Sequence, residues 1–446
     1  MKFNKTLGLY CCVLITLLSC KNDDDHGIND TSNAVIGLVS SVSTYGGSKN
    51  DSAQEVVSTN DGGYAVLGFT QSMNGDITDK QNESFDFWVL KFNEENELQW
   101  NKTYGGTGDD KGQDIIQTLD GGYAILGSSL SNDEDVSGNQ GQNDFWLAKL
   151  DASGTISWQK SFGYLGVDYG ISVIQTSDSG YLISGVLDVT ASGGAGNTSR
   201  MAHAGGDYWA IKLDTSGTIE WSKYYGGLFT DTPEGIVETE DNGFIIVGSS
   251  DSMDTNISNN IGSYDFWVVK IASTGAIVWE KSYGGNEIDE ARSIVKSGDG
   301  NYMIAGDTRS NDVDVSNNKG AADLWLIKIS PLGELLWEKT FGGTSFDVAR
   351  DISATQDGGF LMAGSSRSND EDVAENKGQN DAWALKVNSS GTLEWEASVG
   401  GSNIDFAYGI TELANNTIVV IGDTTSNNKD ITTNKGFTDL LIITIK

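Results

Sequence analysis

Cysteine is almost absent from this sequence, which holds only three cysteines among 446 residues. All three, Cys11, Cys12 and Cys20, lie within the first 20 positions. No disulfide can therefore form within the rest of the chain, even in an oxidising compartment where such bonds are stable. We expect the fold to be stabilised by side-chain packing and strand pairing instead.

Histidine and basic residues are also scarce. The chain has two histidines, His26 and His203, and 28 Lys and Arg against 63 Asp and Glu, which gives a formal net charge of −35. So acidic a surface repels nucleic acid and anionic lipid headgroups, and it attracts cations. A Ser-His-Asp or Cys-His arrangement would have to use His203, and no glycine-rich phosphate loop leads into a helix. The sequence therefore predicts no nucleic-acid partner and favours a non-enzymatic role.

Long hydrophobic runs are missing too. The apolar run at residues 7–18 follows Lys2 and Lys5 and is shorter than the ~20 residues that cross a membrane. It leads into Leu-Leu-Ser-Cys at positions 17–20, which resembles the lipobox of bacterial lipoproteins. The resemblance implies that residues 1–19 are a signal peptide, that Cys20 is lipidated, and that the lipid anchors the protein to a membrane.

Residues 20–33 are predicted to be the lipidated cysteine and a disordered tether, because they are polar and lack large apolar side chains. Lys21 followed by the acidic residues 23–25 resembles the surface-export signal of Bacteroidota lipoproteins, although a plain solvated linker has the same composition. We therefore expect an outer-membrane lipoprotein, with exposure at the cell surface left open.

What the sequence does contain is a repeat. An aromatic-Gly-Gly motif, with variants, begins at positions 45, 104, 162, 225, 283, 341 and 399, a period of about 58 residues. The 12 tryptophans form pairs with members twelve residues apart: 88/100, 146/158, 209/221, 267/279, 325/337 and 383/395. Such regularity predicts seven copies of one structural unit.

Each copy carries four strand signals, which in the second copy are residues 113–118, 123–128, 144–150 and 155–161. Glycine-containing turns separate the first and second strands and the third and fourth, and a long polar loop joins the second to the third. No stretch shows helical periodicity. The pattern predicts an all-β fold over residues 34–446, a seven-bladed β-propeller of four-stranded antiparallel blades.

The two ends of the repeat predict how the ring closes. The last copy stops at Lys446 after its third strand, whereas residues 38–44 precede the first motif, where a fourth strand belongs. We expect this N-terminal strand to complete the last blade and remove the open edges. We also expect Trp146 to lie directly across from Trp158. These pairs are interpreted as packing, although tryptophan stripes also bind sugars.

The repeat resembles a known family. In residues 104–161 the resemblance is carried by Gly105-Gly106, Asp110, Ile115, Asp120-Gly121-Gly122-Tyr123, Gly127 and Lys149-Leu150. It is similar to the bacterial seven-bladed β-propeller repeat of many exported proteins. The resemblance covers about residues 35–446 and implies the fold and export, but the family has no common catalytic residue to carry over.

Two acidic features should share one face of such a propeller. The first is an aspartate five residues after the first glycine of each motif, and we expect it to accept backbone N–H bonds in its own turn. These aspartates, called the ring aspartates below, are Asp51, Asp110, Asp168, Asp231, Asp289, Asp347 and Asp405.

The second acidic feature is the long loop, which has oxygen-bearing side chains at its positions 1, 3, 5 and 12. This spacing is similar to that of calcium loops, so calcium is a candidate cofactor, but Asp and Asn also shape turns without a metal. Copy six keeps Asp370, Asp372 and Asp381 but has Ala374. The candidate metal ligands are Asp133, Asp135, Ser137 and Asp144 in copy two, Asp254, Asn256, Ser258 and Asp265 in copy four, and Asp312, Asp314, Ser316 and Asp323 in copy five.

Copy three is irregular, because its long loop has extra residues and carries Arg200 and His203. Loops often carry binding residues, so these two are candidate binding residues, and a tolerated insertion is the alternative. For the whole chain we expect an exported binding or interaction module at the cell envelope, with a glycan or an envelope protein as partner. The alternatives are a carbohydrate-active enzyme, a glycoside hydrolase or lyase using carboxylates of the acidic loop face, and a purely structural envelope protein.

Overall fold

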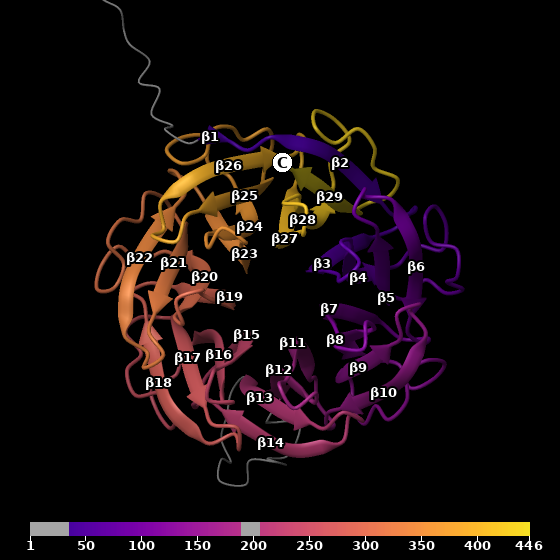
Figure 1. Cartoon of the computed structure of the whole chain (residues 1–446), viewed down its shortest axis with the longest axis horizontal. Helices are drawn as coiled ribbons and strands as arrows, with labels where there is room; N and C mark the ends of the chain where they lie inside the picture. Colours follow the sequence, from indigo (N-terminus) through magenta and orange to yellow (C-terminus); the bar gives the residue numbers. More distant parts are fainter. Residues whose placement is uncertain (1–34, 189–205) are drawn as a thin grey trace, which may run out of the picture. The chain divides into compact units, whose positions relative to one another are not determined.

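The computed structural model describes residues 35–188 and 206–446, all of which belong to one compact unit. Seven antiparallel sheets stand around a common axis in sequence order, as Figure 1 shows. The described part contains only strands, and none of it forms a helix long and apolar enough to span a membrane. The all-β seven-bladed propeller predicted from the repeat is therefore confirmed. Cys20, Arg200 and His203 lie outside the described residues.

Each blade begins with its innermost strand and proceeds outward. The first three blades are β3 (Asp51–Ser58), β4 (Tyr64–Thr70), β5 (Asp86–Phe92) and β6 (Leu98–Tyr104); β7 (Asp110–Gln117), β8 (Tyr123–Ser129), β9 (Asp144–Leu150) and β10 (Ile156–Phe162); and β11 (Tyr169–Gln175), β12 (Tyr181–Asp188), β13 (Gly206–Leu213) and β14 (Ile219–Tyr225).

The next two blades follow the same order. They are β15 (Asp231–Glu238), β16 (Phe244–Ser250), β17 (Asp265–Ile271) and β18 (Ile277–Tyr283); and β19 (Asp289–Lys296), β20 (Tyr302–Thr308), β21 (Asp323–Ile329) and β22 (Leu335–Phe341). The last two blades are β23 (Asp347–Ala354), β24 (Phe360–Ser366), β25 (Asp381–Val387) and β26 (Leu393–Val399); and β27 (Asp405–Glu412), β28 (Ile418–Thr424) and β29 (Asp439–Ile445), to which the N-terminal segment adds β1 (Val35–Ile36) and β2 (Val39–Tyr45).

The N-terminal segment closes the ring, as predicted. Strand β2 pairs antiparallel with β29 and supplies the fourth strand of the seventh blade, with Thr44 opposite Leu441. One difference is that β1 also pairs, in parallel, with β26, so the sixth sheet has five strands rather than four. The Gly37 amide donates to the Glu396 carbonyl at 2.7 Å between these strands. The segment therefore joins the last two blades to each other as well as closing the ring.

The predicted register of the tryptophan pairs is wrong. Trp146 lies opposite Ser161, and Trp158 lies opposite Lys149. Leu150 pairs with Ile156, and the Asp151 amide donates to the Thr155 carbonyl, so the three-residue turn lies one residue later than a turn that would pair the tryptophans. A register shift between Ile156 and Trp158 adds one more residue of offset. The same shift recurs in the other complete blades of the described region, and cross-strand contact between paired tryptophans is therefore absent there.

The packing role of the tryptophans is nevertheless confirmed, in two separate places. The tryptophan of each third strand is buried between blades, and Trp146 contacts Phe87 of the preceding blade with ring centroids 4.7 Å apart. The fourth-strand tryptophan is half-buried and covers the hairpin of the next blade: a Cβ on Gly217 would lie 2.9 Å from the Trp158 ring. Gly217 also has a φ of 78°, so glycine is needed there for both reasons.

We expect deletion of residues 34–44 to lower the melting temperature of the protein by at least ~5 °C. The deletion removes β1 and β2, exposes the edge of β29, and leaves the last blade with three strands. Thermal unfolding followed by circular dichroism measures the change. Deletion of residues 21–33, in the predicted tether, is the control and should leave the melting temperature unchanged. Equal melting temperatures for both deletions and the intact protein would contradict the closing role.

Candidate functional site

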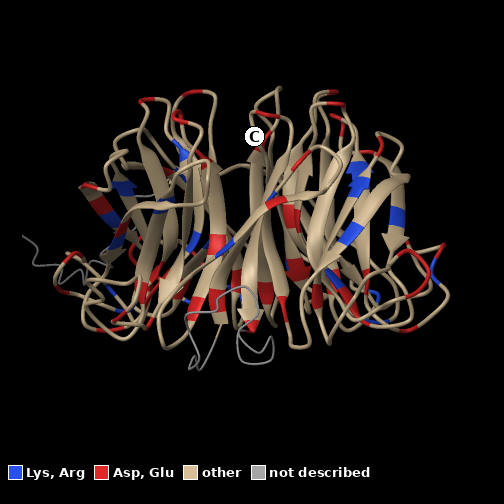
Figure 2. Cartoon of the chain, turned by 90° about the horizontal axis from the view of Figure 1, so that it is seen from below, with Lys and Arg blue, Asp and Glu red and all other residues tan. Residues whose placement is uncertain are grey.

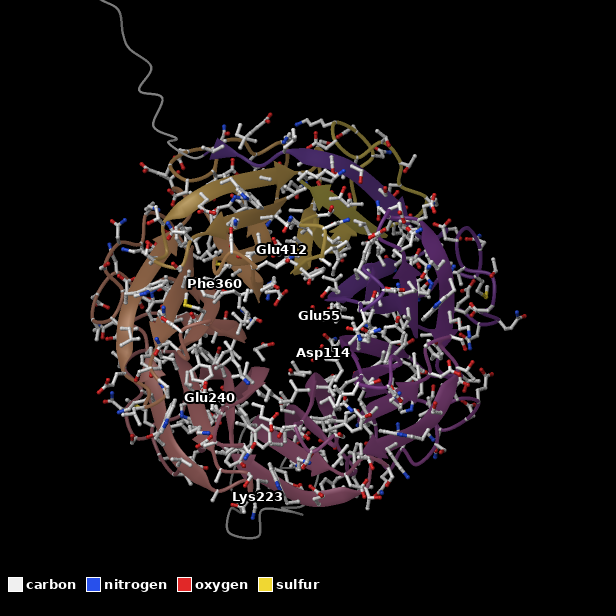
Figure 3. The ribbon with its side chains drawn as sticks, viewed as in Figure 1. Glu55, Asp114, Lys223, Glu240, Phe360 and Glu412 are labelled. Carbon is white, nitrogen blue, oxygen red and sulfur yellow. The ribbon has the colours of Figure 1, made fainter. Side chains whose placement is uncertain are left out.

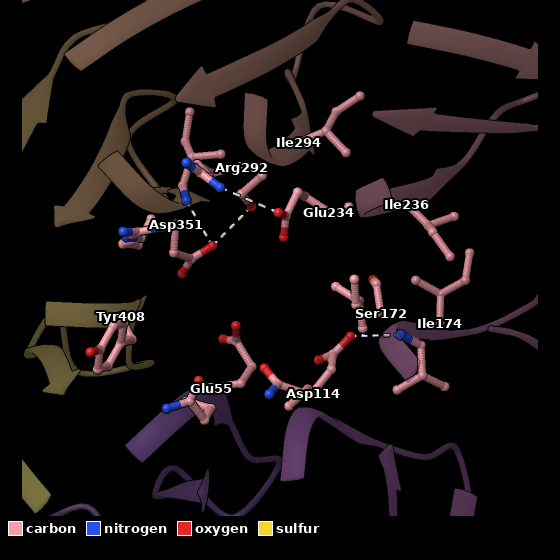
Figure 4. Close-up of a pocket in the computed structure, with 18 residues that line it drawn as sticks. Glu55, Asp114, Ser172, Ile174, Glu234, Ile236, Arg292, Ile294, Asp351 and Tyr408 are labelled. Atoms are coloured by element: carbon pink, nitrogen blue, oxygen red, sulfur yellow. Dashed lines mark hydrogen bonds and ion pairs between the residues drawn. The ribbon is translucent and has the colours of Figure 1, made fainter. Parts of the chain in front are cut away.

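A cavity of about 370 Å³ lies on the axis of the ring, where the innermost strands of all seven blades meet. Figure 3 places Glu55 and Asp114 at this inner edge, and Figure 4 shows the side chains that line the cavity. Its volume falls within the range of known small-molecule sites. This cavity is the candidate functional site.

A β-bulge in each innermost strand directs side chains into the cavity. The ladder between the first and second strands shifts register in every blade; in the first blade the shift falls between Ala53 and Glu55. Bulges re-aim side chains in this way near binding sites. The residues skipped by the shift are Gln54, Gln113, Ile171, Glu234, Arg292, Arg350 and Tyr408, and the residues that follow them are Glu55, Asp114, Ser172, Gly235, Ser293, Asp351 and Gly409.

One wall of the cavity is acidic. Glu55 and Asp114 come from adjacent blades and lie side by side in Figure 4. Asp114 accepts the Val173 amide of the third blade at 2.6 Å, whereas Glu55 accepts only the amide of the next residue, Val56, at 2.9 Å. Burial, followed by repulsion from Asp351 and Asp114, raises the pKa of Glu55 well above its usual range. Burial also raises the pKa of Asp114 to about 6.

Asp351 is a third carboxylate in the cavity, and it is already occupied by protein donors. It accepts the Ser293 hydroxyl at 2.9 Å, its neighbouring Ile352 amide at 2.7 Å and the Ile410 amide of the seventh blade at 3.0 Å. It therefore links the fifth, sixth and seventh blades near the axis. Because its oxygens are satisfied, Asp351 shapes the cavity and its charge, while Glu55 retains capacity to accept a hydrogen bond from a ligand.

The opposite wall carries two arginines with different surroundings. Arg292 is held by three carboxylates, those of Glu234 at 3.3 Å, Glu290 at 2.8 Å and Asp307 at 3.4 Å. Arg350 is exposed in the cavity and forms no ion pair or hydrogen bond with any described residue. The cavity thus offers a free guanidinium facing a group of carboxylates. It can orient a polar ligand through donors on one side and acceptors on the other.

The ring aspartates do not reach this cavity. All seven are buried, and each accepts a backbone amide of the turn four residues earlier, which is Gly-Gly in six blades and Gly163-Tyr164 in the third; the Gly106 amide donates to Asp110 at 2.7 Å, for example. In most blades a hydroxyl two residues past the second strand adds a further bond, as Ser131 does to Asp110 at 2.8 Å. The predicted turn-holding role of these residues is confirmed.

Side chains of the long loop also accept hydrogen bonds from the same Gly-Gly turn, on the side away from the ring aspartate. In the second blade, Asp133 accepts the Thr107 amide at 2.9 Å, and Asp135 accepts the Gly105 amide at 3.3 Å. The side chain at position 4 of this loop, Val136, is buried, as are its counterparts Ile77, Ile257, Val315, Val373 and Ile431. Loop and turn therefore lie on one face, as predicted, and acidic residues are frequent on the loops and rims in Figure 2.

The four candidate calcium ligands of each loop form hydrogen bonds with different parts of the protein. In the second blade, Ser137 accepts from Gln159 of the fourth strand, and Asp144 accepts the Gln140 amide at 2.8 Å. The loops of the fourth and fifth blades form equivalent contacts. At position 1, Asp254 and Asp312 accept the amide that follows the Gly-Gly turn, and at position 3, Asn256 and Asp314 accept the first amide of that turn. At position 5, Ser258 and Ser316 donate to Glu280 and Glu338, and at position 12, Asp265 and Asp323 accept amides of their own loops.

Within residues 35–188 and 206–446, no three His, Cys, Asp or Glu side chains are grouped so that they could hold a metal ion. The contacts of the long loops are those of turn-forming residues. Ligation of calcium by positions 1, 3, 5 and 12 of a single loop stays a prediction.

The cavity residues are not among the features that the seven copies share, so the repeat pattern did not predict them. The ring aspartate is identical in all seven copies and supports the scaffold. The positions three and four residues further on differ from copy to copy, with Gln54, Glu234, Arg292 and Tyr408 at equivalent places. Variation at one position inside an otherwise constant repeat is the signal that could have located the site.

Comparison with known proteins adds likenesses of the fold only. No family model and no curated protein matches the chain. Among solved structures, Sqt1 from Chaetomium thermophilum is 10% identical with a TM-score of 0.45, covering 86% of this chain and 83% of that one. A gluconolactonase from Xanthomonas campestris is 8% identical with a TM-score of 0.37, covering 93% and 97%. Drosophila Plexin A, solved with Semaphorin 1b, is 8% identical with a TM-score of 0.44, covering 89% and 88%.

The pKa values of the aspartates that begin the third strand in six of the blades predict how the stability of the protein depends on pH. Burial is the main cause that raises the pKa of Asp86, Asp144, Asp381 and Asp439 to about 6, and of Asp265 and Asp323 to about 7. A carboxyl whose pKa is raised on folding stabilises the fold below its unfolded pKa, near 4, and loses that contribution as the pH rises through its folded pKa.

We therefore expect the melting temperature to fall between about pH 5 and about pH 8. Below about pH 4 it should fall again, because hydrogen bonds and lysine hold the pKa of Asp120, Asp241 and Asp357 at about 2. Scanning fluorimetry at constant ionic strength measures the profile. Asp265→Asn should flatten the slope above about pH 5. A melting temperature that rises from about pH 5 to about pH 8 would contradict the prediction.

Proposed function

We propose that this chain is an exported, lipid-anchored β-propeller that binds a polar ligand, of the glycan type, in its central cavity at the cell envelope. The observation that carries the proposal is the asymmetry of the cavity. Seven copies of one repeat build the ring, and they differ in side-chain chemistry at the bulged positions that line its centre. The differences place Glu55 and Asp114 on one wall and Arg350 on the other.

A hydroxyl-rich ligand fits these groups. Glu55 and Asp114 accept hydrogen bonds, Arg350 and the glutamine side chains of Gln54 and Gln113 donate them, and the Tyr408 ring offers a flat surface at the side of the cavity. Such a site needs no histidine, cysteine or phosphate loop. The proposed localisation at the cell envelope is supported by the lipobox-like Leu-Leu-Ser-Cys at positions 17–20 and by the strongly acidic composition.

Carbohydrate-active chemistry is the second candidate, and one observation favours it. Glu55 and Asp114 are neighbouring carboxyls with raised pKa values, and such a pair can divide the roles of acid and base. The acidic loop face offers less for this purpose, because the ring aspartates there are buried and hydrogen-bonded to amides. If the protein is an enzyme, we place its carboxyls in the central cavity.

A glycan array with the purified protein tests the proposal. For the best glycan, we expect Glu55→Gln and Arg350→Gln each to weaken binding by about tenfold, because each removes a charged hydrogen-bonding group. Glu95→Gln is the matched control, since it removes one exposed carboxylate from a hairpin of the first blade. Turnover of the glycan that Glu55→Gln abolishes without loss of binding would favour the enzyme. Unchanged binding in both cavity variants would overturn the cavity site.

A separate experiment tests the proposed lipid attachment and membrane localisation. Cys20→Ala removes the thiol that the lipobox-like sequence predicts to be lipidated, so the variant should leave the membrane fraction and take up no labelled fatty acid. Protease added to intact cells then distinguishes the cell surface from the periplasm. Lipid labelling that persists in the variant would rule out Cys20 as the attachment point.

A further inference from the structure

Each pair of adjacent blades meets at two buried aspartates. The aspartate that begins the third strand of one blade lies beside the ring aspartate of the next blade, and the pair Asp323 and Asp347 is one example. At five of the described junctions a third carboxylate, from position 3 of the next blade's long loop, accepts the first amide of the intervening Gly-Gly turn; Asp372 does so from Gly342 at 3.1 Å. Asn256 takes this place between the third and fourth blades. We call such a group of three an interblade junction.

Four of the described junctions contain a lysine. Lys319 pairs with Asp372 between the fifth and sixth blades, and its ammonium also donates to the Thr340 carbonyl at 3.4 Å. Lys377 and Lys435 repeat this arrangement at the next two junctions. Lys80 pairs instead with Asp86 at 2.7 Å, between the first and second blades. At these junctions the protein supplies its own cation to the carboxylates.

The junction between the fourth and fifth blades has no such cation. Ile261 stands where Lys319, Lys377 and Lys435 stand elsewhere. Its carboxylates, Asp265, Asp289 and Asp314, form no ion pair with any lysine or arginine of the described residues. Repulsion from Asp289 and Asp314 adds to burial in raising the pKa of Asp265. This junction therefore carries three carboxylates without a counter-charge.

Polar atoms at the same junction lack partners. Asp265 is fully buried, and its Oδ1 atom forms no hydrogen bond; the same holds for the buried Oγ of Ser282 and Oδ1 of Asn260. At the lysine junction of the fifth blade, the counterparts of the last two are satisfied, because Thr340 donates to the Asn317 carbonyl and Asn318 accepts the Gly320 amide. Unpartnered buried oxygen atoms indicate a missing donor or cation.

The orphaned carboxylate oxygen points at the other carboxylates. A Cβ built on Gly284 would lie 2.5 Å from Asp265 Oδ1 and 2.6 Å from Asp289 Oδ2, so both oxygens border the same glycine. The Gly284 amide itself donates to Asp314 Oδ2 at 3.3 Å. Glycine is required here because any side chain would displace these oxygens. The three carboxylates thus converge on one residue of the turn.

We propose that the junction between the fourth and fifth blades binds a calcium ion in the place that a lysine ammonium takes at the equivalent junctions. Asp265 and Asp314 would supply carboxylate oxygens and Ser282 its carbonyl, the counterpart of the Thr340 carbonyl that Lys319 contacts. Calcium accepts six to eight oxygen ligands in irregular geometry, with water completing the shell, whereas magnesium demands a near-ideal octahedron. The proposed site needs two carboxylates and a carbonyl, and no three His, Cys, Asp or Glu side chains of the described residues are grouped so that they could hold a metal ion by themselves.

The site differs from the calcium loop suggested by the sequence. It takes position 3 of one loop and position 12 of the preceding loop, from two blades, rather than positions 1, 3, 5 and 12 of one loop. The Oδ1 atoms of Asp323 and Asp381 are also unpartnered, but attraction to Lys319 and Lys377 acts on those carboxylates. Among the junctions whose three carboxylates are all described, the one between the fourth and fifth blades is the one at which no lysine pairs with a carboxylate, since Lys80 supplies the cation where Asn82 stands at the equivalent position.

Substitution at Ile261 tests the proposal, because a built-in ammonium should replace the ion. We expect calcium to raise the melting temperature of the chelator-treated wild type more than magnesium or sodium does at equal ionic strength. Ile261→Lys should melt above the wild type in chelator and should show no calcium response. Ile261→Gln is the matched control, since Gln140 stands at this position in the second blade, and it should respond like the wild type. Calorimetric titration should show one calcium fewer for Ile261→Lys.

Two results would overturn the proposal. One is equal stabilisation of the wild type by calcium and magnesium. The other is a full calcium response in Ile261→Lys, which would place the ion elsewhere. In that case Asp133→Ala combined with Asp135→Ala tests the long loop of the second blade: loss of the calcium response in this variant would favour ligation by the loop. A drop in melting temperature that is equal with and without calcium would leave these residues only their hydrogen bonds to Gly105 and Thr107.

Discussion

The hydrogen bond from the Gly-Gly turn to the ring aspartate is the interaction on which the ring depends. Each blade is a complete sheet with satisfied ladders, so nothing in its own pairing determines where the next blade stands. The turn between blades is held by the buried ring aspartate on one side and by the long loop on the other. Amides of this turn have no ladder partner, and a buried carboxylate satisfies them in each blade.

Burial of these carboxylates is unfavourable because the charged groups lose hydration, and the protein offsets this in different ways at different junctions. Hydroxyls such as Ser131 and amides such as that of Gly106 stabilise the ring aspartates. Lysines enter four of the described junctions, with Lys319 as the clearest case. The acidic composition of the chain therefore has a structural component in addition to its effect on solubility, since many of the aspartates bind backbone amides rather than face water.

Much of the fold could be predicted from the sequence because the repeat imposes it. The period, the glycine turns and the missing final strand predicted seven blades and their closure by residues 38–44. The register of Trp146 and Trp158 could not be predicted, since it depends on the exact position of the hairpin turn and on a register shift after it, neither of which leaves a clear sequence signal. The cavity was missed for a similar reason. Whether Glu55 or Arg350 faces the axis is decided by a bulge in the first strand, and adjacent residues of a strand otherwise point to opposite sides.

The closing strand β2 can pair only late in the synthesis of the chain, because its partner is β29. Ser40 and Thr444 bond across 404 positions of chain, so β2 has no partner strand until β29 has left the ribosome. Until then β2 stays unpaired while the strands of the first six blades are synthesised. Contacts this distant in sequence form slowly. A nascent chain of this protein therefore remains an open arc until β29 has been synthesised and can pair with β2.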